Sequence, residues 1–299
     1  MHILIEVILP IVLVVGAGTA IGRTMRLDAT LLSRIILYLL GPALIFRSLV
    51  ESTVALEDVL RITVFVVLIQ VLLWLVSRGI GRVAAWDDDT RAAGSLVLTF
   101  SNCGNYGLAV LLFAYGEAAF TLGVVYMLAS ILMQATLGVG VGSWRHGMSW
   151  RAWIAQVGRV PWLYAFVLSL VVYVAGWQVP TGIYRAIDLL ASAAIPAQLI
   201  LLGIQLARVP LHAIAGEAIV LTALKLTLPP LLAWGLTVLL GVGGLTQAVL
   251  ILEASMPSAI NAMILSMHFG RRPELAATVV FLTTVLSVGS ITLLLSVLN

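Results

Sequence analysis

The chain has 299 residues, of which 62% are hydrophobic and 10% are charged, and its formal net charge is +3. Soluble domains carry about 25% charged residues, so this composition indicates a polytopic membrane protein, and the basic excess gives no support to a nucleic-acid partner because it mostly records orientation. The single cysteine, Cys103, excludes an intrachain disulfide and any metal site built from several cysteines.

Apolar segments of membrane-spanning length follow one another along the whole chain, with short connectors between them. The first lacks a basic segment before it and a convincing cleavage site, so it is interpreted as a membrane span and not as a signal peptide. The sequence therefore predicts an all-α polytopic membrane protein with ten transmembrane helices. The predicted spans are 3–22, 30–50, 58–80, 91–114, 118–142, 160–177, 183–206, 213–241, 246–268 and 273–297.

Landmark residues recur at a single offset of 154 positions, which indicates two related halves. Because five helices is an odd number, the second half must enter the membrane in the opposite orientation, and the repeat is predicted to be inverted. The predicted units are a first repeat at 1–142, a cytoplasmic linker at 143–159 and a second repeat at 160–299. The recurring pairs are Gly22 and Gly176, Pro42 and Pro196, Ser101 and Ser255, and Gly116 and Gly270.

Arginines gather on one set of connectors, twelve against three, which places that set in the cytoplasm and both termini outside it. Lys225, the only lysine, belongs to neither set. The expected location is a bacterial inner (plasma) membrane. The cytoplasmic set is Arg23, Arg26, Arg34, Arg78, Arg82, Arg91, Arg145, Arg151, Arg159, Arg208, Arg271 and Arg272; the other set is Arg47, Arg61 and Arg185.

Two polar connectors allow more than one interpretation. The linker carries Trp144, Trp150 and Trp153 among basic residues, which favours an interfacial segment with an aromatic belt over a regulatory or lipid-contacting loop. The aspartates at 87–89 have no ligand spacing for a cation, so they are interpreted as a solvated connector.

Polar and helix-breaking residues interrupt the fourth and ninth spans, as SNCGNYG at 101–107 and SMPSAIN at 255–261. Unsatisfied backbone groups are costly in hydrocarbon, so such breaks persist where protein, water or substrate satisfies them. Half-helix N-termini at the breaks would attract a carboxylate, whereas the alternative is that the small residues only permit tight packing. The predicted substrate-binding residues are Asn102, Gly104, Asn105, Tyr106, Pro257, Ser258 and Asn261.

Glu253 is a carboxylate inside an apolar span, three positions before Met256, and is predicted to bind a coupling Na⁺ or proton; no other cofactor or metal is expected. Lys225 could pair with a substrate carboxylate or, as the sequence favours, with Glu253. The alternatives to a coupling role for Glu253 are this structural ion pair and an outward-facing polar end of the ninth span. Ser101 and Gln70 are grouped with them as ion-coupling residues, although a lone glutamine in a long helix more often joins two helices.

The chain resembles the auxin efflux carrier family of membrane transporters. The resemblance is carried by residues 102–107 with Tyr115-Gly116, by 256–262, by Lys225-Leu226 before Pro229, and by Pro-Glu-Leu-Ala-Ala at 273–277. It implies ten helices, crossing of the broken helices 4 and 9, a scaffold from helices 1, 2, 6 and 7 that forms a homodimer, and a moving domain from helices 3 to 5 and 8 to 10. It also implies that Asn102 binds the substrate carboxylate. One departure is Ala109, where the family commonly has proline.

The resemblance implies a secondary active transporter of a small organic anion, a mono- or dicarboxylate of the auxin or malate and malonate kind, working by elevator-type alternating access. Coupling to Na⁺ or protons, as a symporter, is expected. One alternative is a sodium-coupled anion transporter similar to the bile acid and sodium symporters, although Pro257 replaces the glutamine expected in their sodium-binding stretch. Another is a membrane sensor that binds the same ligand without moving it. An enzyme is not expected.

Overall fold

The computed structural model describes residues 2–25, 27–50, 54–143, 158, 161–209 and 216–298. All regular structure in these ranges is helical, and seven helical segments there are long and apolar enough to cross a membrane. The predicted linker and its three tryptophans lie almost wholly outside the described residues. The chain is therefore an all-α membrane protein, while the number of ten spans and the inverted repeat stay predictions.

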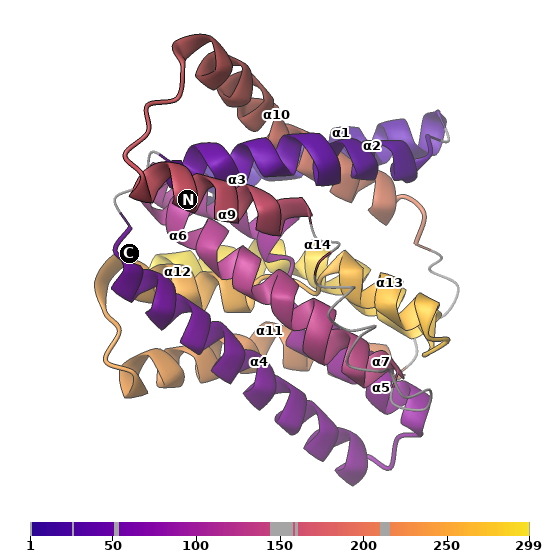
Figure 1. Ribbon diagram of the computed structural model, residues 1–299. Coiled ribbons are helices and arrows are strands. Elements are labelled where there is room, and N and C mark those ends of the chain that lie inside the picture. The colour runs from indigo at the N-terminus through magenta and orange to yellow at the C-terminus, as the bar shows by residue number, and fades with distance from the viewer. Residues whose placement is uncertain are drawn as a thin grey trace.

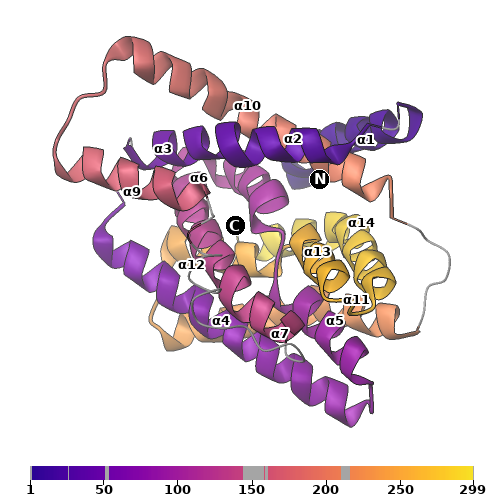
Figure 2. The same cartoon turned by 45° about the vertical axis from the view of Figure 1, so that its right-hand side comes forward.

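The helices form two groups, which lie one above the other in Figures 1 and 2. The upper group contains the predicted first, second, sixth and seventh spans, and the lower group contains the others. The upper group comprises π-helical η1 (Leu4–Ile8) and α1 (Leu9–Thr24), then α2 (Ala29–Ile35), π-helical η2 (Ile36–Leu40) and α3 (Gly41–Val50), and α9 (Pro161–Val174) and α10 (Thr181–Leu206).

The lower group consists of two sets of helices from the two halves of the chain, which pack together around the interrupted segments. From the first half come α4 (Leu56–Val83), α5 (Asp88–Thr99), π-helical η3 (Cys103–Gly107), α6 (Leu108–Met133), π-helical η4 (Gln134–Gly138) and α7 (Val139–Ser143). From the second half come α11 (Gly216–Leu239), α12 (Gly244–Ser255), α13 (Ile260–His268) and α14 (Pro273–Leu298).

Small residues bring α1 and α10 into close contact in the upper group. A Cβ atom at Gly203 would collide with the carbonyl oxygen of Val15, and one at Gly18 would collide with the backbone of Ile200. Thr19 Oγ1 donates a hydrogen bond of 3.1 Å to the Gly203 carbonyl across the same contact. Glycine is therefore required at this crossing, where the two backbones meet as in other closely packed membrane helices.

Two glycines in the left-handed region end the interrupted spans. Gly116 has φ of 76° inside α6, so this helix is two helices joined at a bend, as expected from the predicted spans 91–114 and 118–142. Gly270, 154 positions later, has φ of 64° between α13 and α14. Only glycine adopts this conformation without steric cost, which explains why the pair recurs at the offset of the other landmarks.

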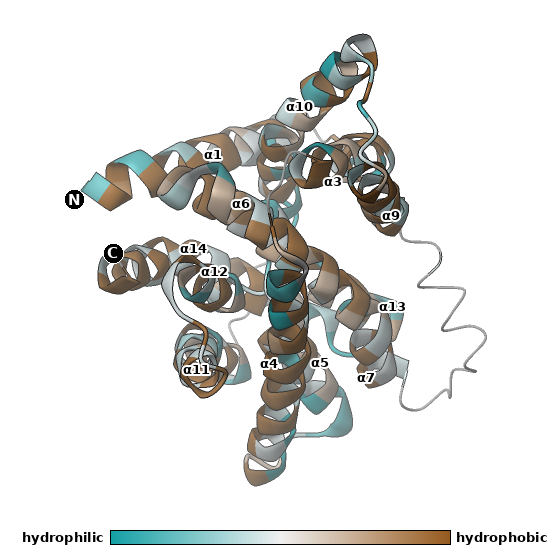
Figure 3. Cartoon of the chain, turned by 60° about the vertical axis from the view of Figure 1, so that its left-hand side comes forward, coloured by the Kyte–Doolittle hydropathy of each residue, from teal (hydrophilic) through white to brown (hydrophobic). Residues whose placement is uncertain are grey.

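The outward surfaces of the helices are apolar (Figure 3), as contact with lipid requires. Exposed examples are Val174 on α9, Leu189 on α10 and Leu231 on α11. Both chain ends lie on one side of the molecule in Figure 3, which agrees with an arrangement that places them on the same membrane face. Which face is cytoplasmic stays a prediction.

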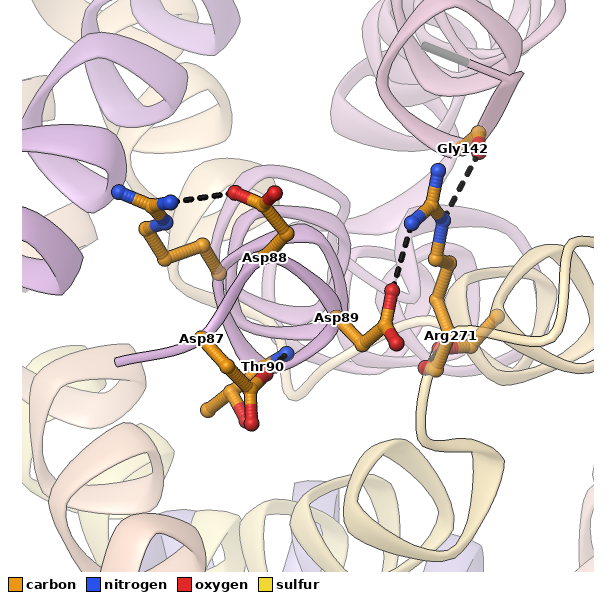
Figure 4. A network of polar contacts seen from close by, with 8 residues as sticks. Asp87, Asp88, Asp89, Thr90, Gly142 and Arg271 are labelled. Carbon is orange, nitrogen blue, oxygen red and sulfur yellow. Dashed lines mark hydrogen bonds and ion pairs between the residues drawn. The ribbon is translucent and has the colours of Figure 1, made fainter. Parts of the chain in front are cut away.

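The aspartates at 87–89 are not simply a solvated connector, because each one holds the start of α5 in a different way (Figure 4). The Asp87 carboxylate accepts a 2.7 Å hydrogen bond from the Thr90 backbone N–H and caps the helix, which lowers the pKa of Asp87. Asp88 pairs with Arg91, and Asp89 accepts a 2.6 Å hydrogen bond from the buried Arg271. The start of α5 is thereby tied to the turn between α13 and α14.

Candidate functional site at the crossing of two broken helices

The interrupted segments of the two halves are hydrogen-bonded to each other. The backbone N–H of Asn102 donates to the Pro257 carbonyl at 2.7 Å, and that of Ala259 donates to the Phe100 carbonyl at 2.9 Å. Between them, Ser101 and Ser258 form an isolated antiparallel bridge. Four of the backbone groups at the two breaks are thus satisfied by one another, which offsets part of the cost of interrupting a helix in hydrocarbon.

Lys225 and Ser101 occupy the C-terminal ends of the half-helices α5 and α12. Lys225 Nζ, which is fully buried, donates to the Leu98 carbonyl at 3.1 Å and to Ser101 Oγ at 2.9 Å. Ser101 Oγ in turn donates to the Ala254 carbonyl at 2.7 Å. A cation is favoured at this negative end of a helix dipole, so the ammonium group stabilises the carbonyl ends that the breaks expose.

The expected ion pair between Lys225 and Glu253 is absent from the described part of the chain. Lys225 donates to a carbonyl and a hydroxyl, and both carboxyl oxygens of Glu253 are buried without a hydrogen-bond partner there. Helix C-termini supplied acceptors for the ammonium group, which the sequence spacing alone does not reveal.

After each break the chain resumes as a second half-helix, η3 with α6 in the first half and α13 in the second half. The N-terminal ends of these two half-helices line a cavity of about 250 Å³ between the two helix groups. Neither η3 nor α13 has a side-chain cap on its first N–H groups. The wall from the upper group includes Leu37 of η2 and Trp162 of α9. The helix ends contribute Asn102, Cys103, Gly104, Asn105, Ile260 and Asn261.

The cavity lining contains amides and helix N-termini but no charged side chain. The Asn102 side-chain amide nitrogen is buried and has no acceptor within the described residues. Asn261 Nδ2 donates to Gln134 Oε1 at 3.1 Å. Free N–H donors at two converging helix N-termini are suited to bind an anion, because the helix dipoles add positive potential there.

Three predicted substrate residues do not line this cavity. Ser258 Oγ donates to the Val97 carbonyl at 2.9 Å, the Pro257 carbonyl accepts from Asn102, and the Tyr106 hydroxyl accepts from Ser287 at 3.4 Å. Their contacts hold the crossing segments against α5, η3 and α14. The structure thus brings Asn102, Gly104, Asn105 and Asn261 together at the cavity and places Tyr106, Pro257 and Ser258 behind it.

Glu253 lies outside the cavity lining, in a niche formed by two glycines. It is fully buried on α12, where a Cβ atom at Gly107 would collide with its carboxyl group and one at Gly123 would come within 3.1 Å of Oε1. A buried carboxyl group without a hydrogen-bond partner must be neutralised, so this niche fits a proton or a small cation. The described residues hold no cluster of three metal-ligating side chains, so backbone and hydroxyl oxygens would have to complete any Na⁺ site.

Gln70 lies on α4 and joins α6. Its Nε2 donates to Ser130 Oγ at 2.8 Å, and its Oε1 is buried without a donor among the described residues. This contact is the interhelical role that a lone glutamine commonly has in membrane helices.

Gln134 is a site residue that the sequence analysis missed. It lines the cavity from η4 and accepts the hydrogen bond from Asn261. The available signal was a lone amide in the fifth apolar span, but its meeting with the ninth span depends on tertiary packing.

Comparison with known proteins finds similar sequences among membrane transporters. The sequence profile of the membrane transport protein family matches residues 1–142 and 148–295. An uncharacterized transporter of Methanothermobacter thermautotrophicus is 30% identical over 275 residues, covering 89% of this chain and 88% of that protein. An uncharacterized transporter of Methanocaldococcus jannaschii is 25% identical over 288 residues, covering 94% and 93%.

A third relative carries a substrate in its name. A candidate malonate transporter of Rhizobium meliloti is 29% identical over 206 residues, covering 66% of this chain and 63% of that protein. The family match extends over nearly the whole chain and includes both interrupted segments. The chain therefore belongs to the membrane transport protein family, the auxin efflux carriers that its sequence resembles.

Proposed function

We propose that this protein is a secondary active transporter of a small organic anion, a mono- or dicarboxylate, which binds in the cavity at the helix crossing. One observation carries the proposal: two uncapped half-helix N-termini converge on the cavity beside the unpartnered amide of Asn102. Such an arrangement offers directed N–H donors and positive potential without a fixed counter-ion that would hold the substrate too tightly.

The size of the cavity supports a small substrate. Its volume of about 250 Å³ lies below the range of about 300–1,000 Å³ usual for pockets that bind drug-sized ligands. The name of the Rhizobium relative supports a short dicarboxylate such as malonate as the first compound to test.

Glu253 is proposed as the coupling group, binding Na⁺ or a proton. Its carboxyl group is buried without a partner and packs against Gly107, which follows the cavity-lining residues of η3. A cation bound there would neutralise the carboxylate and change how η3 packs. Coupling requires that the ion bind one conformation better than the other, and this placement provides a physical route to that difference.

Transport by an elevator motion is proposed because the cavity lies between the two helix groups. The lower group carries both interrupted segments, so its displacement against the upper group would move the bound anion across the membrane. The upper group would then be the static scaffold and the dimer interface of a protein in a bacterial inner membrane, with both termini outside the cytoplasm. If the coupling ion is Na⁺, the transporter would work as a sodium-coupled anion symporter, as the bile acid symporters do.

Counterflow in proteoliposomes tests the function. Vesicles loaded with unlabelled malonate should accumulate external labelled malonate when they contain the protein, and protein-free vesicles should not. A panel of acetate, malate and indole-3-acetate would define the class. Saturable malonate binding without counterflow of any panel member would favour the sensor and overturn the transporter proposal.

A further inference from the structure

A second polar cavity, of about 220 Å³, lies in the lower group, away from the helix crossing. Four guanidinium groups contribute to its lining together with one carboxylate, that of Asp88. Figure 4 shows two of the lining residues, Asp88 and Arg271, from close by. The four arginines are Arg78 and Arg82 of α4, Arg91 of α5 and Arg271 of the turn before α14.

The positive charge in this cavity exceeds the negative charge around it. Arg91 pairs with Asp88, and Arg271 pairs with Asp89. The side chain of Arg82 is exposed and has no hydrogen bond or ion pair within the described residues. Arg78 has polar or electrostatic contacts of its own, and its guanidinium carbon lies 5.5 Å from the centroid of the Trp74 ring. Within the described residues, the lining arginines and the ion-pair partners of Arg91 and Arg271 amount to four guanidinium groups and two carboxylates, so their formal charges sum to a net positive site for an anion.

The site is held in place by the fold. Arg271 is only 3% exposed, and its Nε donates to the Gly142 carbonyl at 3.2 Å while Nη1 donates to Asp89. A guanidinium group has five N–H donors, so Arg271 keeps further donors beyond these two contacts. Contacts with α5 and α7 fix the side chain of Arg271, so the position of its positive charge is set by the fold.

We infer that this cavity binds a phosphate group, from a phospholipid headgroup or from free phosphate. Several guanidinium groups match the several oxygens of a phosphate better than a single carboxylate would. Arg78 and Arg82 place this cavity along α4, where the nearby apolar residues Leu75 and Val83 are 53% and 91% exposed. Lipid chains can lie along that apolar surface while the headgroup enters between the arginines.

The inference does not depend on the transport proposal, because none of these residues lines the cavity at the helix crossing. It also gives a role to arginines that the sequence analysis used only for orientation.

The test compares thermal unfolding of the full chain in nanodiscs of phosphatidylcholine and of phosphatidylcholine mixed with phosphatidylglycerol. Inorganic phosphate is titrated in the phosphatidylcholine discs, with sodium chloride at matched ionic strength as the salt control. The variants are Arg82→Ala and Arg78→Gln. The matched control is Arg23→Ala, an exposed arginine at the end of α1 in the upper group that carries the same charge.

A phosphatidylglycerol-dependent rise in Tm identifies the headgroup as the source, and a rise with inorganic phosphate alone identifies free phosphate. In either case Arg82→Ala should weaken binding about fivefold, as expected for one arginine near a lipid phosphate, whereas Arg23→Ala should not. The inference is wrong if neither phosphate source raises Tm, or if Arg82→Ala, Arg78→Gln and Arg23→Ala all respond as the unsubstituted protein does. Exposed Arg82 is expected to be replaceable without loss of folding.

Discussion

Ser101 and Ser258 lie opposite each other in an antiparallel bridge that joins the two interrupted helices. Ser101 also accepts the hydrogen bond of Lys225 and donates to the Ala254 carbonyl, so it links the C-terminal ends of both half-helices. The N-terminal ends have no comparable side-chain partners and open onto the cavity. The crossing is therefore asymmetric, since the ends that carry negative potential are occupied by the protein and the ends that carry positive potential are available to a ligand.

Asn102→Ala and Asn261→Ala should each weaken substrate binding by about tenfold to a hundredfold. Each removes an amide donor beside the helix N-termini, and a hydrogen bond to a charged group contributes about 1.5–3 kcal/mol. Asn102→Asp should weaken binding more strongly because it places a carboxylate beside the substrate carboxylate. The measurement is the concentration of malonate that gives half-maximal counterflow.

Gln247→Ala is the matched control for these variants, because it removes an amide from α12 that bonds Thr237 and does not line the cavity. Equal losses in Gln247→Ala and Asn102→Ala would contradict a direct role of Asn102.

Glu253→Gln should abolish the dependence of uptake on Na⁺ or pH. The amide keeps the shape of the side chain and cannot become charged, so the niche no longer selects a cation. Thermal stability at neutral pH should be unchanged or higher, because a buried carboxyl group without a partner is costly. Uptake against pH and Na⁺ concentration, with the exposed Glu274→Gln as control, checks this prediction. Retention of the full ion dependence by Glu253→Gln would remove Glu253 from the coupling mechanism.

The interrupted helices could be predicted because polar and helix-breaking residues in an apolar span have few explanations. The predicted offset between the two interruptions was less accurate. The half-helix α5 ends at Thr99 and α12 ends at Ser255, 156 positions later, whereas the landmark residues recur at an offset of 154. Side-chain direction was not predictable in the same way. Asn102 lines the cavity, whereas Tyr106, four residues later, bonds Ser287 behind it. Asn102 has non-helical backbone angles and Tyr106 lies in the π-helical segment η3, so the usual helical spacing does not relate the directions of the two side chains.

Gly107→Ala should destabilise the protein by about 1–3 kcal/mol, the usual cost of overpacking a core, because its Cβ atom would collide with the Glu253 carboxyl group. Gly79→Ala is the control, since a Cβ atom there meets nothing within 4 Å, and it should be neutral or slightly stabilising. Unfolding should be followed for both in detergent.

A double variant separates this collision from a general need for glycine in η3. Gly107→Ala combined with Glu253→Ala should lose less stability than the sum of the two single changes, because the second change removes the colliding group. Simple additivity would show that Gly107 is required for another reason.

Acidification should destabilise the start of α5 through Asp87. The hydrogen bond from the Thr90 N–H lowers the pKa of Asp87 in the folded protein, so its stabilisation is present above the unfolded value of about 3.9 and is lost as pH falls through the lower folded value. Asp87→Asn keeps a cap without a titrating group and should reduce the loss of stability below about pH 4. Identical pH profiles of Tm for the two proteins would contradict the capping role.

Lys225→Met should lower stability by about 3 kcal/mol or more. The change keeps an unbranched chain of similar length but leaves the Leu98 carbonyl without its cation and removes one of the two contacts of Ser101 Oγ. Arg185→Met, at an exposed position of α10, removes the same charge as a control and should have little effect.

In a double-mutant cycle, Lys225→Met and Ser101→Ala should show a coupling energy of about 0.5–3 kcal/mol, because the two side chains share one hydrogen bond. If the cycle is additive, Lys225 does not act through Ser101, and the occupied C-terminal ends of the crossing would have to be stabilised in another way.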